Sequence, residues 1–252
     1  MLIRTLSHVK SLLLVLAVGI STTSCAQQTG PPADERPVKT KTMKIEIWSD
    51  VMCPFCYIGK RKFEAALQKF EGKENVVVEW KSFQLNPDMV TDTSKSTVDY
   101  LAESKGWTKE YTRETMSYVV NMAKEVGLNY NFDKAVVANS FDAHRLIQLA
   151  KTLGKGDALE ERLFKAYFVE GKNTADHATL SALATEIGLP EADVKAVLNS
   201  DKFSADVKRD IAESEQLGIR GVPFFVIDRK YGISGAQDSQ VFLDSLNKAW
   251  KQ

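Results

Sequence analysis

The order of strand and helix patterns along the chain constrains its fold more than any other feature of the sequence. Four segments have the β-branched or alternating apolar side chains of strands: 43–48, 76–80, 224–227 and 231–234. A helix pattern separates the first two. From about residue 91 to 200 strand patterns are nearly absent, and helix patterns cover 98–106, 109–126, 138–153, 157–170, 179–187 and 191–198. Two further helices are expected at 205–217 and 239–250. This order predicts an α/β fold in which a layer of strands and helices, formed by the two ends of the chain, is interrupted by an all-helical insertion.

Two cysteines three residues apart stand where the first strand pattern gives way to a helix. Pro54 suits the first helical position, so the sulfur of Cys53 is expected near the free N–H groups at the positive end of the helix dipole. That environment favours a thiolate, which is the nucleophile of disulfide exchange. Cys56 follows about one helical turn later on the same face. The spacing therefore predicts that Cys53 attacks a substrate and that Cys56 resolves the mixed disulfide.

Two other interpretations of this pair stay open. A structural disulfide would close so short a loop that its entropic contribution would be small. A zinc site usually takes four cysteine or histidine ligands, and after residue 42 the chain offers only His144 and His177 besides the pair. We therefore expect redox chemistry and no bound metal.

The first 25 residues differ in character from the rest. Arg4 and Lys10 precede the apolar run 12–20, and small polar residues then lead to Cys25. This pattern is typical of a secretory signal. The apolar run is about half of the ~20 residues that a membrane-spanning helix needs, so a retained membrane span is the weaker interpretation. Residues 1–25 are therefore predicted to direct export, and the polar residues 26–42 to form a flexible tether.

Cys25 has two interpretations. It resembles the modified cysteine of a bacterial lipoprotein, although Thr22 stands where that signal usually has Leu. The stretch Ser24-Cys25-Ala26 also fits an ordinary signal peptidase site. We expect a periplasmic protein, anchored to the membrane by a lipid if Cys25 is modified. Either outcome removes Cys25 from redox chemistry.

Charge and composition narrow the range of partners. The chain has 33 basic and 33 acidic residues and no long run of one sign, so nucleic acid is not an expected partner. Its hydrophobic content of 44% is ordinary for a globular protein and is enough for a sizeable core.

Five short motifs follow one another along the chain. They are Ser49-Asp50 leading into Cys53-Pro54-Phe55-Cys56-Tyr57-Ile58-Gly59, then Phe83-Gln84-Leu85-Asn86-Pro87, Asn139-Ser140 with Ala143-His144-Arg145-Leu146, Gly221-Val222-Pro223-Phe224-Phe225, and Ser234-Gly235-Ala236-Gln237. Together they resemble the DsbA-like thiol-disulfide oxidoreductases of the FrnE type, a branch of the thioredoxin superfamily. The resemblance covers about residues 43–250.

The resemblance implies a thioredoxin-like domain formed by residues 43–90 and 201–252, with the helical insertion at 91–200. It implies exchange with protein or peptide thiols and disulfides, no dissociable cofactor, and glutathione as a conceivable co-substrate. The motifs do not specify the partner that recycles the dithiol. Members of the family commonly have Trp where this chain has Phe55, so an altered redox poise is expected.

Pro223 is the second anchor of the resemblance. Thioredoxin-like proteins have a cis-proline opposite the dithiol, and the Val222-Pro223 bond is similar to that feature; bonds preceding proline readily take the cis form. Because Pro223 lacks an N–H and precedes a strand pattern, Val222 would offer free backbone groups to an extended substrate. Pro54 and Phe55 are expected at the same substrate-binding surface. A strand-entry proline in a turn is the alternative.

Three polar residues near these motifs have two interpretations each. His144 and Arg145 are candidates for lining a substrate cleft between the helical insertion and the dithiol. Alternatively, His144 packs within the protein or lies on its surface, and Arg145 pairs with Asp142. Asp50, three positions before Cys53, either disfavours the thiolate or caps a turn.

The leading hypothesis is an exported thiol-disulfide oxidoreductase, with oxidation of protein thiols expected ahead of isomerisation or reduction. A second is a glutathione-dependent transferase or small-molecule isomerase. Relatives with that chemistry typically have Ser at the first active-site position, where this chain has Cys53. A third is a peptide-binding holdase in which the dithiol is only a structural bridge.

Overall fold

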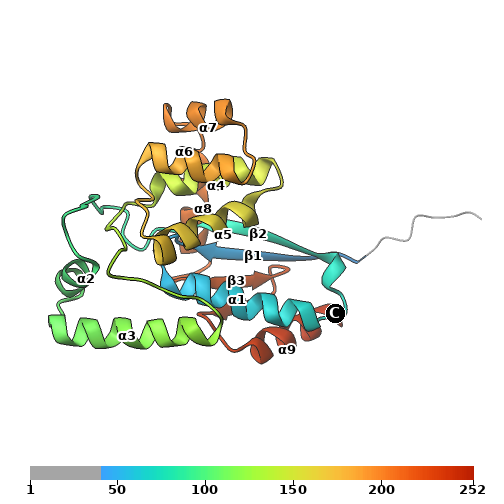
Figure 1. The fold of residues 1–252 in the computed structure, drawn as a ribbon. Helices are drawn as coiled ribbons and strands as arrows, with labels where there is room; N and C mark the ends of the chain where they lie inside the picture. The colour runs from blue at the N-terminus through green and yellow to red at the C-terminus, as the bar shows by residue number, and fades with distance from the viewer. Residues whose placement is uncertain (1–40) are drawn as a thin grey trace, which may run out of the picture. The chain divides into compact units, whose positions relative to one another are not determined.

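The computed structural model describes residues 41–252, and within this range the strands form one mixed sheet (Figure 1). The strands are β1 (Met43–Ser49), β2 (Val76–Ser82), β3 (Phe224–Ile227) and β4 (Tyr231–Ser234), in the spatial order β2-β1-β3-β4. β1 pairs in parallel with β2 and antiparallel with β3, which in turn pairs antiparallel with β4. All four strands form where the sequence predicts them.

β1 is one of the two inner strands, and most of its residues on both faces are buried. Ile47 lies between Trp80 of β2 and Phe225 of β3 in the register. Successive strand residues point to opposite faces; of the two charged residues in the alternation, Lys44 is exposed but Glu46 is only 1% exposed. The guanidinium of Arg229 pairs with the Glu46 carboxylate. Glu46 is therefore buried where simple alternation suggests a solvent-facing residue, and its carboxylate pairs with a guanidinium that remains exposed.

Helices cover both faces of the sheet. On one face, Phe63 of α1 (Pro54–Lys69) contacts Phe225 of β3 and Phe242 of α9 (Ser239–Trp250), with ring centroids 5.5 and 5.8 Å apart. On the other, the Trp48 indole donates a hydrogen bond of 2.9 Å to the Asp210 carbonyl in α8 (Ser204–Gln216). The sheet is therefore the middle layer between α1 with α9 and α8.

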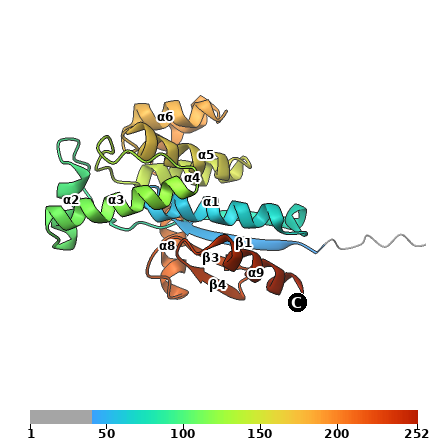
Figure 2. The same cartoon turned by 60° about the horizontal axis from the view of Figure 1, so that its bottom comes forward.

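The long segment between β2 and α8 consists of helices joined by loops, and its only strand-like pairing is an isolated bridge between Asp92 and Val137. Its elements are α2 (Thr97–Lys105), α3 (Lys109–Glu125), α4 (Phe141–Thr152), α5 (Gly156–Lys165), the π-helical turn η2 (Ala166–Glu170), α6 (His177–Glu186) and α7 (Glu191–Leu198). A short 3-10 turn, η1 (Lys73–Asn75), precedes β2. α2 is in contact with α3 and lies near one end of it in both views (Figures 1 and 2).

Two helix boundaries differ from the sequence prediction for local reasons. The helix expected from residue 138 starts at Phe141, because Val137 bridges to Asp92 and the Asn139 side chain accepts a hydrogen bond from the Phe141 N–H at 2.8 Å. The helix expected over 157–170 changes from α to π geometry at Ala166. Both departures lie where side-chain hydrogen bonds or wider turns compete with the α-helical pattern.

The helical segment shares its hydrophobic core with the sheet. One cluster joins Ile45 and Ile47 of β1 to Leu146 of α4, Leu163 of α5 and Val194 of α7. α4 and α5 both contact the edge strand β2. The insertion is therefore packed onto the sheet through a continuous core.

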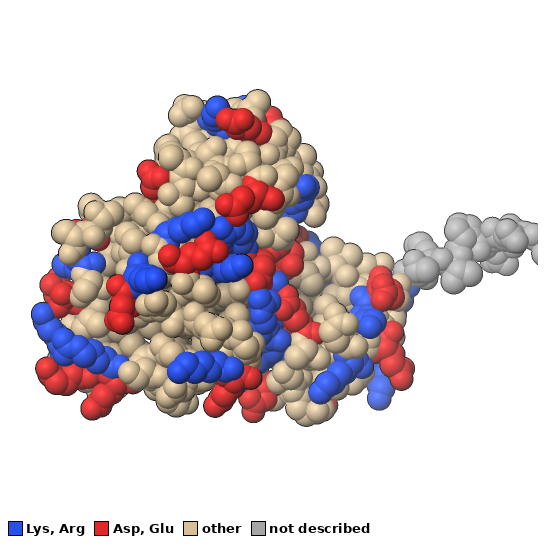
Figure 3. All heavy atoms as spheres, viewed as in Figure 1, with Lys and Arg blue, Asp and Glu red and all other residues tan. Residues whose placement is uncertain are grey.

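The predicted leader at residues 1–25 and nearly all of the predicted tether at 26–42 lie outside the described residues. Within residues 41–252, none of the helices has the length and hydrophobicity that a membrane span requires. On the face drawn in Figure 3, basic and acidic side chains are interspersed, as the balanced charge of the chain suggests.

Candidate active site

The dithiol lies at the junction of β1 and α1. Cys53 is the residue that caps α1, with extended backbone geometry (φ −85°, ψ 111°), and Pro54 is the first helical residue. The Cys53 N–H bonds to the Asp50 carbonyl at 2.9 Å, which turns the chain from strand to helix. Cys53 is 4% exposed and Cys56 is fully buried, and no disulfide joins them. The predicted strand-to-helix placement of the pair is confirmed.

The segment that enters β3 meets this junction. The Val222-Pro223 peptide bond is cis, and the Cys53 Sγ lies 3.4 Å from the Val222 carbonyl oxygen. The Gly235 N–H donates to the Pro223 carbonyl at 2.8 Å, so the loop after β4 supports the proline. Segments about 170 residues apart in the chain thus meet at one sulfur atom.

Gly59 allows this close approach. A Cβ atom at position 59 would lie 2.9 Å from the Cγ of Pro223 and 3.5 Å from the Cα of Ala236. Side chains essentially never approach so closely without displacing a neighbour. The lack of a side chain on α1 at this point therefore permits the proline to rest on the helix.

Apolar side chains, most of them from the helical insertion, surround the two cysteines. The cluster includes Tyr57, Tyr130, Phe164 and Phe168, and its rings pack in series: the Tyr57 and Phe164 centroids are 4.9 Å apart. The Tyr130 hydroxyl donates a hydrogen bond of 2.7 Å to the Pro54 carbonyl. The insertion therefore forms part of the wall around the dithiol and holds the first residue of α1.

Phe55 and Val222 form the accessible part of the site. Phe55 is 36% exposed, which is the most of any residue in the Cys-Pro-Phe-Cys sequence, and Pro54 and Val222 are half-buried. A substrate that reaches Cys53 meets these residues.

A buried polar cluster lies beside Cys56. The Ser49 hydroxyl donates a hydrogen bond of 2.6 Å to Glu160 of α5. The His144 Nε2 lies 3.4 Å from an oxygen of Asp50. All four side chains are at most 1% exposed. Two carboxyl groups and one imidazole are thus enclosed next to the dithiol.

The environment shifts the pKa values of this cluster. Burial raises the pKa of Glu160 to about 7, against the opposing effects of His144 and Ser49. Burial lowers the pKa of His144, but the Asp50 carboxylate outweighs it, so the net pKa is raised. Burial also raises the pKa of Cys56 well above its ordinary value, and Cys53 adds to that shift. These shifts follow from desolvation and from close charges.

Asp50 caps a turn, one of its two predicted roles. Its carboxylate accepts hydrogen bonds from the Leu85 N–H at 2.7 Å and from the Met52 N–H at 3.3 Å. These bonds join the loop after β2, which carries the Phe83–Pro87 motif, to the loop that carries Cys53.

Arg145 lies apart from the dithiol. Its guanidinium donates to the carbonyls of Lys202, Val197 and Ser200 and pairs with Asp142 at 2.7 Å. It is 4% exposed, and these bonds join α4 to the end of α7. Of the two residues predicted for a substrate cleft, His144 therefore lies in the buried cluster, whereas Arg145 pairs with Asp142 as the alternative interpretation states.

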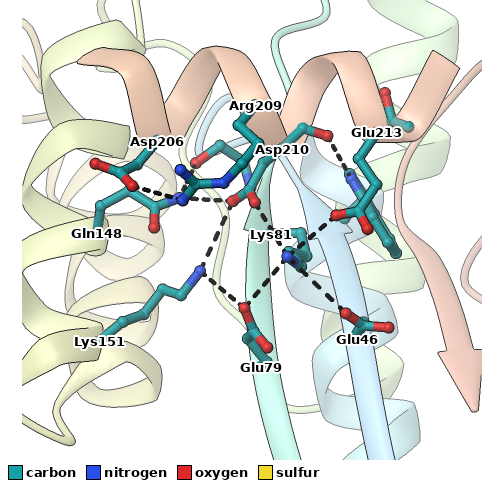
Figure 4. Close-up of polar contacts among 12 residues, drawn as sticks. Glu46, Glu79, Lys81, Gln148, Lys151, Asp206, Arg209, Asp210 and Glu213 are labelled. Carbon is teal, nitrogen blue, oxygen red and sulfur yellow. Dashed lines mark hydrogen bonds and ion pairs between the residues drawn. The ribbon is translucent and has the colours of Figure 1, made fainter. Parts of the chain in front are cut away.

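A charge network fixes the helix that leads to the cis-proline. Asp210 of α8 accepts hydrogen bonds from the Ser82 N–H at 3.0 Å and the Gln148 amide at 2.6 Å, and pairs with Lys81 at 3.1 Å (Figure 4). After α8 the chain runs directly to Ile219 and Val222, which pack near Trp48. The network therefore fixes α8, which precedes the segment whose Val222 carbonyl contacts Cys53.

Three features of this site escaped the sequence analysis. Tyr130 lies in a loop whose position no pattern predicts. Glu160 falls between Leu159 and Leu163 on the buried side of its helix, and a carboxyl at such a position is a weak signal of a buried polar site. The role of Gly59 depends on packing against Pro223, about 160 residues away in the chain.

A sheet of this order, with a dithiol at the start of a helix and a cis-proline against it, defines a thiol-disulfide oxidoreductase of the thioredoxin fold. The profile of the DSBA-like thioredoxin domain matches residues 44–247. The chain belongs to this family.

Individual proteins are similar to most of the chain. The chain is 32% identical over 220 residues to the uncharacterized protein YwbO of Bacillus subtilis, covering 84% of this chain and 99% of that one. It is 37% identical to the probable DsbA oxidoreductase SCO1869 of Streptomyces coelicolor, with a TM-score of 0.79 over 83% of this chain and 91% of that one. The cytosolic disulfide reductase DsbM of Pseudomonas aeruginosa, solved with GSH, shares the fold at 18% identity and a TM-score of 0.60, over 83% of this chain and all of that one.

Proposed function

We propose that the protein is an exported thiol-disulfide oxidoreductase of the FrnE type that acts through the Cys53–Cys56 dithiol. The observation that carries this proposal is the position of the Cys53 Sγ, at the start of α1 and 3.4 Å from the Val222 carbonyl. Backbone N–H groups at a helix start favour a thiolate, and the Val222 backbone borders the same atom.

The exchange proceeds in two balanced steps. The Cys53 thiolate attacks one sulfur of a substrate disulfide, forms a mixed disulfide and releases the other sulfur as a thiolate. Cys56 then attacks the Cys53 sulfur, so the protein becomes oxidised and the substrate is released as a dithiol. Oxidation of a substrate dithiol is the same sequence in reverse. Neither direction needs a dissociable cofactor.

An extended peptide is the substrate class that best suits the rim of the site, which is the accessible part formed by Phe55 and Val222. The half-buried Val222 backbone at the entry to β3 can pair with an extended chain, and the exposed ring of Phe55 offers an apolar contact beside it. In an exported setting we propose oxidation of protein thiols as the main direction. The unit that recycles the dithiol would be a separate redox protein or glutathione.

Export is proposed from the leader pattern at residues 1–25, and lipid attachment from Cys25. Fractionation of cells that produce the full chain tests both. A protein cleaved before Cys25 and held in the membrane fraction, but released by the Cys25→Ser substitution, supports a lipid anchor. A protein that keeps residues 1–25 and stays in the cytoplasm contradicts export.

Glutathione chemistry is the second candidate function. It is favoured by the fold shared with DsbM, which was solved with GSH. The presence of Cys53 at the first active-site position favours dithiol exchange over transfer to a small molecule. Cys56→Ala separates the two functions, since it should abolish catalytic turnover of disulfides but spare glutathione transfer.

The test of the main proposal is a redox titration of the full chain against glutathione, read by thiol alkylation and mass. A potential of roughly −120 to −180 mV supports donation or isomerisation of disulfides, and one near −270 mV would support reduction. A Cys53–Cys56 bond that glutathione never reduces would contradict the enzymatic proposal. In that case the holdase hypothesis gains support, and Cys53→Ala would leave function intact.

A further inference from the structure

The two segments that border Cys53 carry almost no charge. They are residues 51–59, which contain the dithiol, and residues 217–225, which contain the cis-proline. Together they hold a single Lys, Arg, Asp or Glu residue, which is Arg220. The charged residues on either side of the first segment, Asp50 and Lys60, are buried. The charge that these two segments present to solvent is therefore one guanidinium.

Arg220 differs from the other arginines of residues 41–252 in having no partner. The other arginines in this range pair with carboxylates; they are Arg61, Arg113, Arg145, Arg162, Arg209 and Arg229. Arg220 is exposed, and with the rest of residues 41–252 it forms no hydrogen bond, ion pair or ring contact. Its guanidinium is therefore available to a group that reaches the site from solvent.

The backbone of Arg220 is held close to Cys53 although its side chain is not held. Ile219 is 3% exposed and packs in one cluster with Trp48 and Val222, so both ends of the short stretch 219–222 are fixed. Two residues of chain span at most about 7 Å, which limits the distance between the Cα atoms of Arg220 and Val222. The Val222 carbonyl lies 3.4 Å from the Cys53 Sγ. The guanidinium thus extends from a fixed point beside the nucleophile.

A guanidinium in this position suits a carboxylate. Its charge is permanent, and its planar fork of N–H donors matches the two oxygens of a carboxylate. Side chains two residues apart on an extended chain point to the same side. If an extended substrate pairs with Val222, the residue two positions along that substrate lies opposite Arg220. A carboxylate at that place is close to the sulfur that Cys53 attacks.

We propose that Arg220 selects substrates that carry a carboxylate beside the exchanging sulfur. The inference rests on the proposed function, because it concerns which substrates that exchange accepts. The carboxylate can belong to an acidic side chain of a peptide or to glutathione, which has two. Arg220 binds the substrate in either case and takes no part in the transfer of electrons between sulfur atoms.

The first test compares two small chromogenic disulfides. Dithiobis-nitrobenzoate has a carboxylate on each ring, whereas dithiodipyridine is uncharged. The reaction rate of the reduced full chain with each reagent is measured at low and at high salt. Arg220→Gln should slow the reaction with dithiobis-nitrobenzoate by about threefold to fivefold at low salt and by less at high salt. The reaction with dithiodipyridine should stay within about twofold.

Three further variants complete this test. Arg220→Lys keeps the charge and should recover part of the rate, and Arg220→Glu should slow dithiobis-nitrobenzoate more than Arg220→Gln does. Arg209→Gln is the matched control, because it removes the same charge from an exposed arginine on α8 that pairs with Asp206 (Figure 4). The control should leave the ratio of the two rates unchanged. Equal slowing of both reagents in Arg220→Gln, or the same change of ratio in Arg209→Gln, would overturn the proposal.

The second test identifies the source of the carboxylate. Disulfide peptides with Glu, Gln or Lys two residues from each cysteine are compared with oxidised glutathione as substrates. A preference for the Glu peptide that Arg220→Gln abolishes and Arg220→Glu turns toward the Lys peptide supports an acidic protein substrate. A loss confined to oxidised glutathione supports glutathione as the source. Rates that are independent of Arg220 for the peptides and for glutathione would overturn the proposal, whereas failure of the unaltered chain to exchange with any of these disulfides would contradict the proposed function itself.

Discussion

The two cysteines of the dithiol differ in their surroundings. Cys53, 4% exposed, lies next to the accessible rim of the site, against the carbonyl of Val222 and near Phe55, which is exposed. Cys56 is enclosed, with hydrogen-bonding polar groups and buried titratable side chains next to it. The rim is built by the thioredoxin-like layer, whereas the enclosed side depends on Glu160 and His144 from the helical insertion.

The thioredoxin-like layer and the helical insertion therefore contribute different groups to the site. The thioredoxin-like layer presents a nucleophile and backbone groups to an incoming chain. The insertion supplies part of the wall around the dithiol, one hydrogen bond to Pro54 and the buried carboxyl of Glu160, which bonds to Ser49. The insertion therefore belongs to the active site, and the predictions below test how separate the two sides are.

The largest expected effect concerns the cysteines. Cys53→Ala removes the nucleophile and should abolish disulfide turnover, whereas Cys56→Ala should keep the first step and stop at the mixed disulfide. Incubation with a disulfide peptide, followed by mass measurement without reductant, checks this. Cys56→Ala is expected to carry one covalently bound peptide and Cys53→Ala none. A stable adduct on Cys56 in Cys53→Ala would show that the enclosed side is accessible and would break the comparison.

The rim is the part of the site that sequence reasoning locates well. The cysteine spacing, the helix-start proline and the strand pattern after Pro223 are local signals, and the structure brings these segments together as the resemblance to thioredoxin-like proteins implies. The element order is likewise recovered, because periodicity of apolar residues is strong in all four strands and in most helices.

The enclosed side is not accessible to the same reasoning. Ser49 and Glu160 are 111 residues apart, and their contact depends on how α5 packs against the end of β1. Arg145 and His144 are adjacent in sequence yet serve different places, because neighbouring positions of a helix face different directions. Contacts of this kind arise from tertiary packing and leave no periodic signal in the chain.

The second prediction measures the charge on Glu160 through stability. Burial raises the pKa of Glu160 from 4.5 to about 7, so the native state disfavours the ionised carboxyl. The protonated carboxyl stabilises the native state below pH 4.5, and this contribution is lost as the pH rises through 7. Glu160→Gln removes this dependence. Its free energy of unfolding relative to the unaltered chain should therefore rise by up to about 3 kcal/mol between pH 4 and pH 8.

Urea unfolding at several pH values provides the measurement. Glu46→Gln serves as the comparison, because Glu46 is held by cationic partners. A difference between Glu160→Gln and the unaltered chain that stays constant with pH would show that Glu160 titrates normally, and the enclosed side would then be only a packing feature.

The third prediction acts on the rim. Gly59→Ala places a methyl group 2.9 Å from the Pro223 ring, so the ring and the adjoining Val222 must shift. Because the Val222 backbone would contact a peptide but not a small disulfide, turnover of a disulfide peptide should fall several-fold while reaction with dithiobis-nitrobenzoate is spared. The stability should fall by about 1 to 3 kcal/mol, partly offset by the better helix propensity of Ala.

Gly156→Ala is the matched control for this substitution. A Cβ there would also lie 2.9 Å from a neighbour, but that neighbour is the flexible side chain of Lys151. The control should leave both reactions unchanged. Equal loss of both reactions in Gly59→Ala would indicate damage to Cys53 itself rather than to substrate docking.

The smallest expected effect tests the one hydrogen bond from the insertion to the dithiol sequence. Tyr130→Phe keeps the ring stack with Phe168, whose centroid is 4.6 Å away, but removes the 2.7 Å bond to the Pro54 carbonyl. A single buried hydrogen bond contributes about 1 kcal/mol, and urea unfolding should detect a loss of that size. Tyr118→Phe on the exposed face of α3 should cost nothing measurable, since Tyr118 is 64% exposed.

If the glutathione redox equilibrium also moves in Tyr130→Phe but not in Tyr118→Phe, the insertion tunes the rim as well as the enclosed side, and the division between the two sides is incomplete. An unchanged equilibrium confines the influence of the insertion to Cys56.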